Sequence, residues 1–331
     1  MSSHASPPLP LSPASLEPRG QGLSRPECVL ATASGDLYTA DWRGGVAILA
    51  ADGSQTLIGG SLPDGRPLRP NGIALERDGA FLLADLGDTE GGVFRLRRDG
   101  TVTPVVVDVD GMRLPPTNFV LIDAQLRLWI TVSTRRVPRA LGYRRDVADG
   151  FVVLADERGA RIVADGLGYT NEVAIDPDGG YLYVNETFAR RTSRFAIRAG
   201  GALGPRETFT EYGEGTFPDG LAFDEDGFLW VVSIVSNRVL RVAPDGQSTT
   251  WIEDADAAHV AWVEAAYREG TLGRPHLDGV ASKRLRNISS IAFGGADRRT
   301  AFLGCLLGDA LFSFRAPAAG VAPAHWHWPQ S

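Results

Sequence analysis

Six residues with oxygen-bearing side chains open six similar segments of this 331-residue chain. Each segment continues with apolar or small residues, a turn that carries Asp, and a second apolar run that ends about fourteen residues after the start. The opening residues are Glu27, Asn71, Asn118, Asn171, Asp219 and Ser289. Convergent carboxylate and amide oxygens suit a hard cation such as Ca²⁺, which accepts about six to eight oxygen ligands in a flexible geometry. The pattern therefore predicts a divalent-metal site, provided that the fold brings the segments together.

The spacing of the segments indicates which fold does so. Successive starts are separated by 44, 47, 53, 48 and 70 residues, and a four-stranded propeller blade takes about 40–50 residues. Turn sequences such as DPDGG at 176–180 and apolar runs such as FLWVV at 228–232 are typical of hairpins. We therefore expect an all-β protein, a six-bladed β-propeller with four-stranded blades. The equivalent position of each blade then lies on one ring around the axis.

The 70-residue spacing leaves room for a helical insertion at about 254–287, between blades five and six. Residues 254–270 have a helix-forming composition with one apolar face. Two interpretations stay open. The insertion packs on the rim of the propeller, or it covers the tunnel as a lid and carries His259 or His276 towards a substrate.

The nature of the ion follows from the donor atoms. An all-oxygen ring favours Ca²⁺ and also fits Mn²⁺ or Mg²⁺, whereas Zn²⁺, which stays possible, more often takes His or Cys ligands. The competing interpretation is that these Asn and Asp residues only cap turns before strands. A second polar set lies about fourteen residues further along four repeats, and it either holds a second ion or satisfies strand-end amides. Its members are Asp41, Asp85, Asn185 and Ser233.

Composition limits the other possibilities. A formal net charge of −7 argues against nucleic-acid binding, which depends on clustered cations. No segment resembles a secretory signal or reaches the ~20 apolar residues of a membrane span, so we expect a cytoplasmic protein without membrane partners. Cys28 and Cys305 are expected to be reduced and buried, with one bridge as the alternative. We expect a disordered leader at 1–20, one propeller domain at 21–318 and a C-terminal tail at 319–331.

Several motifs resemble one known family. They are Glu27 after a proline, TNFVLID from Thr117, TNEVAIDPDGGYLYV from Thr170 and FPDGLAFDEDGFLWV from Phe217. From about residue 25 to 315 the chain resembles the SMP-30/gluconolactonase/LRE family, with the related diisopropylfluorophosphatase-like and strictosidine-synthase-like propellers. The resemblance implies a six-bladed propeller, lactone hydrolysis, and one metal ion. The ligands that it implies are Glu27, Asn118, Asn171 and Asp219.

The chain also departs from the family pattern. Phe119 stands where Asp or Gly is frequent, and Glu172 stands where Gly is usual. Pro116 replaces the arginine that contacts the sugar in sugar-lactonases, so the resemblance does not by itself imply an aldonolactone substrate. No histidine opens a repeat, in contrast to the His dyad of paraoxonase-like members.

These observations predict a metal-dependent hydrolase that opens a small lactone or related ester. The ion acts as a Lewis acid, and Asp219 is the catalytic base or nucleophile. Four further residues are expected to bind substrate or water: Asn71, Ser289, Phe119 and Glu172. The alternatives are a lyase or isomerase that uses the same ion, and a non-catalytic scaffold. The expected partner is a small molecule, and the oligomeric state stays open between monomer and dimer.

Overall fold

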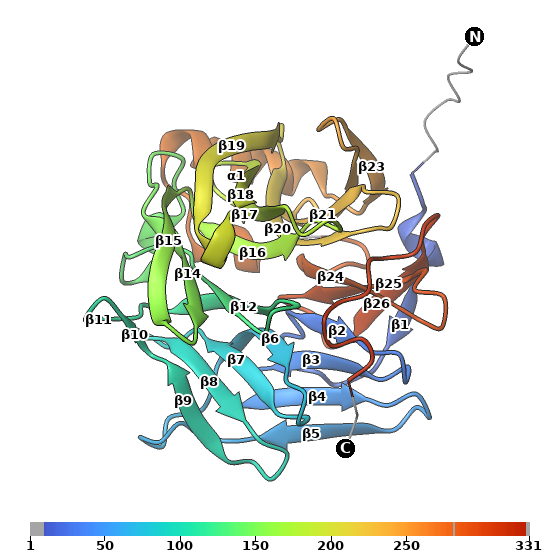
Figure 1. Ribbon diagram of the computed structural model, residues 1–331. Helices are drawn as coiled ribbons and strands as arrows, with labels where there is room; N and C mark the ends of the chain where they lie inside the picture. Colours follow the sequence, from blue (N-terminus) through green and yellow to red (C-terminus); the bar gives the residue numbers. More distant parts are fainter. Residues whose placement is uncertain (1–9, 281, 329–331) are drawn as a thin grey trace.

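The computed structural model describes residues 10–280 and 282–328. Within them, the predicted six-bladed β-propeller is confirmed as six four-stranded antiparallel sheets (Figure 1). Blades one to three consist of β2 (Val29–Ala31), β3 (Leu37–Asp41), β4 (Gly45–Leu49) and β5 (Gln55–Gly59); β6 (Pro70–Leu75), β7 (Phe81–Asp85), β8 (Gly92–Leu96) and β9 (Val102–Val106); and β12 (Thr117–Ile122), β13 (Leu128–Val132), β14 (Gly150–Asp156) and β15 (Gly159–Leu167).

Blades four to six follow the same order from the axis outwards. They consist of β16 (Thr170–Ile175), β17 (Tyr181–Glu186), β18 (Arg191–Ile197) and β19 (Leu203–Glu211); β20 (Thr216–Phe223), β21 (Leu229–Val235), β22 (Arg238–Val242) and β23 (Ser248–Glu253); and β24 (Ile288–Gly294), β25 (Thr300–Cys305), β26 (Leu311–Arg315) and β1 (Glu17–Arg19). A short hairpin of β10 (Asp108–Val109) and β11 (Met112–Arg113) lies between blades two and three.

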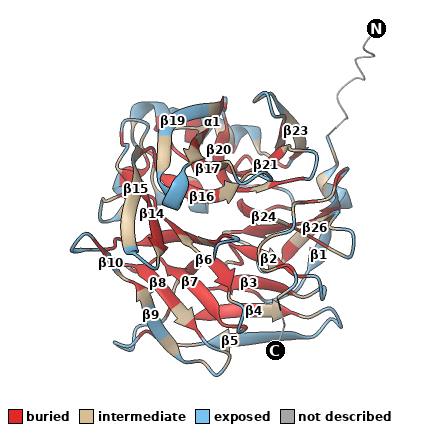
Figure 2. Ribbon diagram, in the orientation of Figure 1, coloured by how far each residue is buried: buried red, intermediate tan, exposed pale blue. Residues whose placement is uncertain are grey.

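The innermost strands β2, β6, β12, β16, β20 and β24 contact one another in turn around the axis. Because each blade is covered by its neighbours, the middle strands are buried on both faces: every residue of β7 is buried, whereas most of the outermost strand β5 is exposed (Figure 2). Aromatic rings join neighbouring blades, as where the ring centroids of Tyr38 and Phe81 lie 5.4 Å apart. The packing between blades therefore forms the core and fixes where each inner strand meets the axis.

The N-terminal region closes the ring of blades. Strand β1 pairs with β26, with Glu17 opposite Ser313, so the two ends of the chain share blade six. Leu16 is buried in the same core, and Leu11 forms a bridge to Ile252 of blade five. The structure therefore differs from the expected disordered leader for residues 11–19; residues 1–9 of that leader lie outside the described residues.

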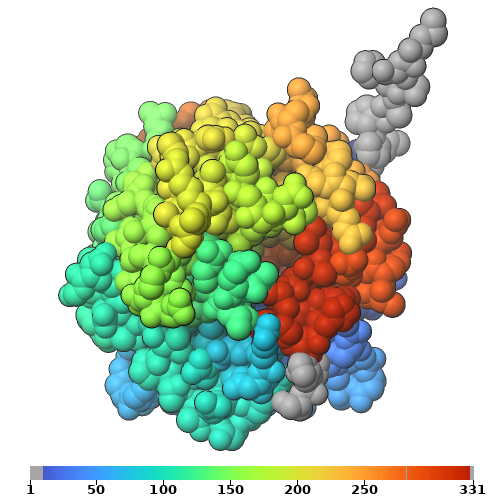
Figure 3. Space-filling model, in the orientation of Figure 1, coloured from blue at the N-terminus to red at the C-terminus, as the bar shows by residue number. Residues whose placement is uncertain are grey.

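The C-terminal segment 316–328 is also ordered, in contrast to the frayed tail that is usual for terminal residues. It crosses the face of the propeller opposite to the repeat starts, where Val321 donates to the carbonyl of Phe223. His325 Nε2 lies 3.2 Å from the carbonyl oxygen of Ala31, and Trp326 is buried. Figure 3 shows this segment, in red, on the face that the view presents. Residues 329–331 lie outside the described part of the chain.

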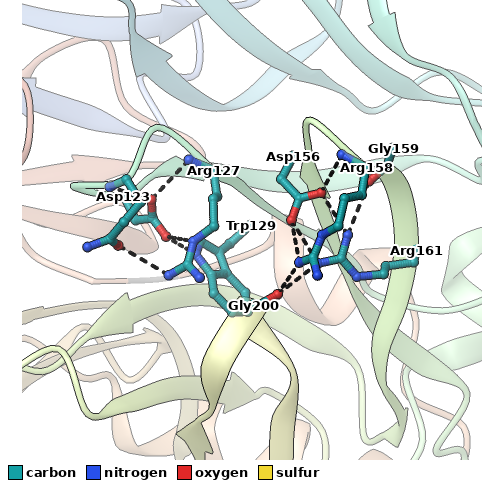
Figure 4. Close-up of polar contacts among 9 residues, drawn as sticks. Asp123, Arg127, Trp129, Asp156, Arg158, Gly159, Arg161 and Gly200 are labelled. Carbon is teal, nitrogen blue, oxygen red and sulfur yellow. Dashed lines mark hydrogen bonds and ion pairs between the residues drawn. The ribbon is translucent and has the colours of Figure 1, made fainter.

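Aspartates fix the turns on this same face. In the turn between β12 and β13, one oxygen of Asp123 accepts from the backbone N–H of Arg127 at 2.9 Å, and the other accepts from the indole of Trp129 at 2.8 Å (Figure 4). Asp224 binds the indole of Trp230 in the same way in blade five, at 2.9 Å. The repeated turn motif thus ties each turn to the core of its own blade.

A second cluster in Figure 4 joins two blades. Asp156, at the end of β14, pairs with Arg158 of the following turn and with Arg161 of β15. Both arginines also donate to the carbonyl of Gly200 in the short 3₁₀ helix η3 (Ala199–Gly201) of blade four. The contact anchors blade three to blade four at the periphery.

The insertion contains α1 (Ala257–Glu269) and α2 (Arg274–Asp278), as the helical composition predicts. Asp256 caps α1 by accepting from the backbone of His259, and Gly270 ends it with a φ of 71°. The apolar face of α1 packs onto blades four and five, where the hydroxyl of Tyr267 donates to the carbonyl of Phe188 at 2.6 Å. The same cluster contains Tyr169 and Phe217, which lie two residues before Asn171 and Asp219, so this contact fits both interpretations of the insertion. Ala281 of the predicted insertion lies outside the described residues.

Two further expectations concern the whole chain. Cys28 and Cys305 are both free and buried, so the alternative of a bridge between them is wrong. In the described parts of the chain, no helix combines the length and the apolar character that a membrane crossing requires.

The C-terminal segment predicts a measurable pH dependence. Burial lowers the pKa of His325 to about 4, below its value of about 6.5 in an unfolded chain. Between these two pKa values the unfolded state therefore binds more protons than the folded state. The contribution of neutral His325 to the free energy of unfolding is complete above pH 6.5 and is lost as the pH falls towards 4. We expect wild type to lose about 2 kcal/mol more stability than His325→Gln between pH 7 and 5. Urea unfolding at both pH values measures this, and His327→Gln, in an exposed neighbour, should behave like wild type.

Candidate metal centre

The six oxygen-bearing residues occupy equivalent places at the start of the inner strands. Five lie within β6, β12, β16, β20 and β24, and Glu27 comes two residues before β2. All six are buried, with exposed fractions of 5% for Glu27, 3% for Asp219 and no more than 4% for the others. Side chains of one blade hold the backbone of the next: Asn71 donates to the carbonyl of Asn118 at 3.0 Å, and Ser289 to that of Glu27 at 3.1 Å.

A local irregularity places each of these side chains. In the five repeats from Asn71 onwards, the pairing of the inner strand with its neighbour shifts register at the oxygen-bearing residue. A β-bulge leaves such a residue without a partner across the ladder and redirects its side chain. The bulges therefore turn residues that would belong to regular strands towards the axis. Nothing in the repeat pattern alone revealed them.

Close approach of the inner strands accompanies the bulges. A Cβ added to Gly220 would lie 2.5 Å from the carbonyl oxygen of Ser289, and one added to Gly72 would lie 2.6 Å from Cα of Phe119. Side chains are excluded at these two positions because the neighbouring backbone is already there. The oxygens on the ring are thus held by a tightly packed set of strands.

The amide oxygens on the ring have no hydrogen-bond partner. Oδ1 of Asn71, of Asn118 and of Asn171 is buried and unpaired, although Asn171 donates through Nδ2 to Thr187 at 3.0 Å. Buried acceptors are usually satisfied, and an unpaired one requires an explanation such as an ion. A hard cation on the axis would supply the missing partner. The residues present therefore fit a divalent ion with oxygen ligands.

The acids on the ring are electrostatically unbalanced. Burial raises the pKa of Asp219 well above its ordinary value, and the nearby charges of Glu27 and Glu172 raise it further. Arg25 offsets part of this by pairing with Glu27, at 2.9 Å between Nη2 and Oε2. Two buried carboxylates beside each other are costly unless a cation lies between them. A divalent ion would remove this repulsion.

The ring is not a cluster of conventional metal-binding residue types. Among residues 10–280 and 282–328, no group of three or more His, Cys, Asp or Glu is arranged to hold a metal. The predicted ligands include only two acids, and amides supply the remaining oxygens. This donor set is typical of Ca²⁺ and disfavours Zn²⁺.

Phe119 and Glu172 lie on the far side of the ring from its mouth. Both line a cavity of ≈ 500 Å³ that extends along the axis towards the C-terminal segment and is walled mainly by apolar side chains. Glu172 accepts from the backbone of Leu221 at 3.4 Å, and burial, with a smaller effect of Glu27, raises its pKa to about 8. The structure thus brings these two residues beneath the ring.

The mouth itself is covered by residues that the sequence analysis missed. Three of them stand two positions before a ring residue, where Arg25 and Tyr169 precede their strands with φ of 50° and 68° and Phe217 lies within β20. Arg139, in the 3₁₀ helix η2 (Arg139–Gly142), and Tyr143 complete the cover. The place of the first three, two residues before a repeat start, was the available signal for them.

The second polar set satisfies backbone amides. Asp41 accepts from the backbone N–H of Ser24 at 3.1 Å and pairs with Arg43. Asp85 accepts from the backbone of Arg69 at 2.7 Å and of Gly87 at 3.2 Å. These contacts favour the interpretation that the set completes strand ends rather than holding a second ion.

The fold and the ring define a class, the six-bladed propellers with an oxygen-lined site on the axis. A model of the SMP-30/Gluconolactonase/LRE-like region matches residues 89–262, just over half of the chain. The chain belongs to this family.

Curated relatives match over part of their length. A 6-deoxy-6-sulfogluconolactonase of Pseudomonas putida is 34% identical over 106 residues, which cover 31% of this chain and 36% of the relative. An L-arabinolactonase of Azospirillum brasilense is 26% identical over 178 residues, 49% of this chain and 57% of the relative. The matched region thus spans between about a third and just over half of these relatives.

Solved structures agree over nearly the whole fold. A gluconolactonase of Xanthomonas campestris superposes with a TM-score of 0.65 at 21% identity, covering 94% of this chain and 99% of that one. Regucalcin of Agrobacterium tumefaciens, described as a calcium-binding protein, superposes with a TM-score of 0.64 at 16% identity, covering 91% and 92%. At these identities the likeness establishes the fold.

Because the acids are buried, we expect removal of one of them to have opposite effects on thermal stability with and without metal. In chelator, Asp219→Asn should unfold at a temperature several degrees above wild type, because it removes one of two neighbouring buried charges. In millimolar Ca²⁺ the order should reverse, since the ion stabilises only the protein that binds it, by about 2.7 kcal/mol at one hundred times Kd. Thermal unfolding in both buffers measures the two effects. Asp226→Asn, in an exposed turn of the same blade, should change neither; identical shifts in all three proteins would contradict the site.

Proposed function

We propose that the protein is a divalent-metal-dependent hydrolase that opens a small lactone or a related ester. The observation that carries the proposal is the ring of buried, unpaired amide oxygens beside Glu27 and Asp219. Family membership supports lactone chemistry, because two of the curated relatives are named as lactonases. Their names concern a sulfonated gluconolactone and L-arabinolactone, so they leave the substrate of this chain open within that class.

The proposed ligands are Glu27, Asn118, Asn171 and Asp219. Ca²⁺ is the proposed ion because all the donors are oxygens, and a similarly folded protein is described as calcium-binding. When bound, the ion supplies Lewis acidity for the lactone carbonyl and positive charge where negative charge develops. Asn71 lies on the same ring outside this set, and its free Oδ1 is placed to hold water or substrate.

Asp219 is the proposed catalytic base, with direct nucleophilic attack as its alternative role. Its backbone is held in place from blade four, where Asn185 donates to the carbonyl of Asp219 at 2.9 Å and Thr187 to that of Pro218 at 2.8 Å. As a base, its carboxylate takes a proton from water while the water oxygen bonds to the carbonyl carbon. The ring C–O bond then breaks, and the proton passes to the leaving alkoxide oxygen.

The other predicted residues have supporting roles in this proposal. Ser289 uses its hydroxyl to hold the backbone of Glu27, so it positions a ligand and is covered by the next strand. Phe119 and Glu172 lie beneath the ring, where both line the axial cavity. Arg25 keeps one oxygen of Glu27 occupied and orients its carboxylate.

Lactone opening before and after chelation tests the proposal. We expect chelator-sensitive hydrolysis of a panel of five- and six-membered lactones, restored by Ca²⁺ and reduced at least about 10²-fold in Asp219→Asn. Asp226→Asn should retain wild-type rates. Hydrolysis in ¹⁸O-labelled water should place the label in the product. A metal-bound protein that converts a substrate without taking up label would instead be a lyase or isomerase, and a protein that binds no metal would contradict the proposal.

A further inference from the structure

Arg139, above the ring, differs from the neighbouring arginines in its contacts. Arg139 donates from Nη2 to the hydroxyl of Ser133 at 3.2 Å, whereas its Nε is buried and has no hydrogen-bond partner. Among the described residues, Arg139 forms no ion pair, although the neighbouring Arg135 and Arg136 pair with Asp165 and Asp149. Its guanidinium lies 5.6 Å from the ring centroid of Tyr169. An arginine with a buried, unused donor is incomplete without an acceptor.

A second arginine, Arg274 of the insertion, also lies near the residues above the ring. Arg274, in α2, interacts with the hydroxyl of Tyr143 and keeps Asp278 as its carboxylate partner at 2.7 Å. Burial alone would raise the pKa of Tyr143, yet the positive charges of Arg139 and Arg274 lower it below its ordinary value. The surroundings of this hydroxyl are therefore electropositive, within a protein whose formal net charge is −7.

Metal binding would leave this positive charge uncompensated. Arg139 is close enough to Glu27 and Asp219 to interact with both carboxylates. A divalent ion balances those two negative charges, so Arg139 would then face a neutral centre. Arg139, whose Nε has no acceptor, would then lie above the ring with Arg274 and the hydroxyl of Tyr143 nearby. Such a group binds an oxyanion through charge-assisted hydrogen bonds.

We propose that the substrate carries an anionic substituent, a carboxylate, sulfonate or phosphate, which Arg139 binds at the tunnel mouth with help from Arg274 and Tyr143. This proposal rests on the proposed function, which assigns a lactone or ester as the reacting group. It adds a charged group on a part of the substrate that does not react. Because the arginines come from the loop between β13 and β14 and from the insertion, the anion joins these two segments above the ring. The insertion thus contributes to specificity through Arg274, while His259 and His276 lie with Trp262, with ring centroids 5.7 and 4.2 Å from it.

A purely electrostatic role for Arg139 has different consequences. If Arg139 only balances the acids of the ring, its removal would change metal affinity and the stability of the metal-free protein. It would not change the preference between a ligand that carries the additional anionic group and one that lacks it. The two roles are therefore separated by comparing ligands that differ only in the charged group.

The test uses the Ca²⁺-loaded full-length protein and two readouts. Calorimetry compares gluconate with derivatives that carry a phosphate, a sulfonate or a carboxylate at C6. We expect at least one derivative to bind about 10- to 100-fold more tightly than gluconate, as charge-assisted hydrogen bonds imply. Arg139→Gln should remove most of this difference, Arg139→Lys should keep part of it, and Arg274→Gln should reduce it. Arg136→Gln, an exposed arginine of the same loop, is the matched control and should bind as wild type does.

The second readout is kcat/KM for glucono-1,5-lactone and its charged C6 derivatives. Equal affinity of wild type for all four acids would overturn the proposal, and so would a preference that survives in Arg139→Gln. If Arg139→Gln does not fold, as judged by its thermal unfolding, Arg139→Lys and Arg274→Gln decide the question. Preferential binding of a charged acid without opening of any lactone would overturn the proposed function and leave this inference standing. Opening of lactones without a preference for a charged group would overturn this inference and leave the proposed function standing.

Discussion

Two carboxylates, Glu27 and Asp219, are held together on the axis of the propeller, where almost no water reaches them. Like charges in such a place repel each other and lose their hydration, so the arrangement opposes folding unless positive charge is supplied. Arg25 supplies part of that charge through its ion pair. The rest of the structure can be understood as what is needed to keep these two acids, and the amides beside them, in place.

Packing between the faces of neighbouring blades holds these residues in place. Buried strands such as β7 pack against neighbouring blades, and β1 closes blade six with the opposite end of the chain. Closure makes the ring rigid because no inner strand can move without displacing its neighbours. The bulges at the repeat starts are stabilised by that packing, which lets irregular backbone persist where side chains must point inwards. A stable scaffold therefore supports a site that is itself unfavourable without its ion.

Much of this could be predicted from the sequence, for a definite physical reason. A propeller repeats one supersecondary unit, so equivalent residues recur at blade spacing, and Asn118, Asn171 and Asp219 could be aligned by eye. The pairing of β1 with β26 could not, because three exposed residues carry no periodic signal. The ordered C-terminal segment and the side of the ring on which Glu172 lies depend on tertiary contacts and bulges, which spacing does not encode. Arg139 was missed because it comes from a loop outside the repeat.

The central claim is that the axis holds one divalent ion between the acids and the unpaired amides. A crystal structure of the protein grown with Mn²⁺ in place of Ca²⁺, with anomalous scattering collected at the manganese edge, tests it most directly. The account predicts a single strong peak on the axis, about 2.0–2.6 Å from oxygens of Glu27, Asn118, Asn171 and Asp219. A ring without a peak, with Arg139 turned in to pair with Asp219, would contradict it, because the acids would then be neutralised by the protein itself.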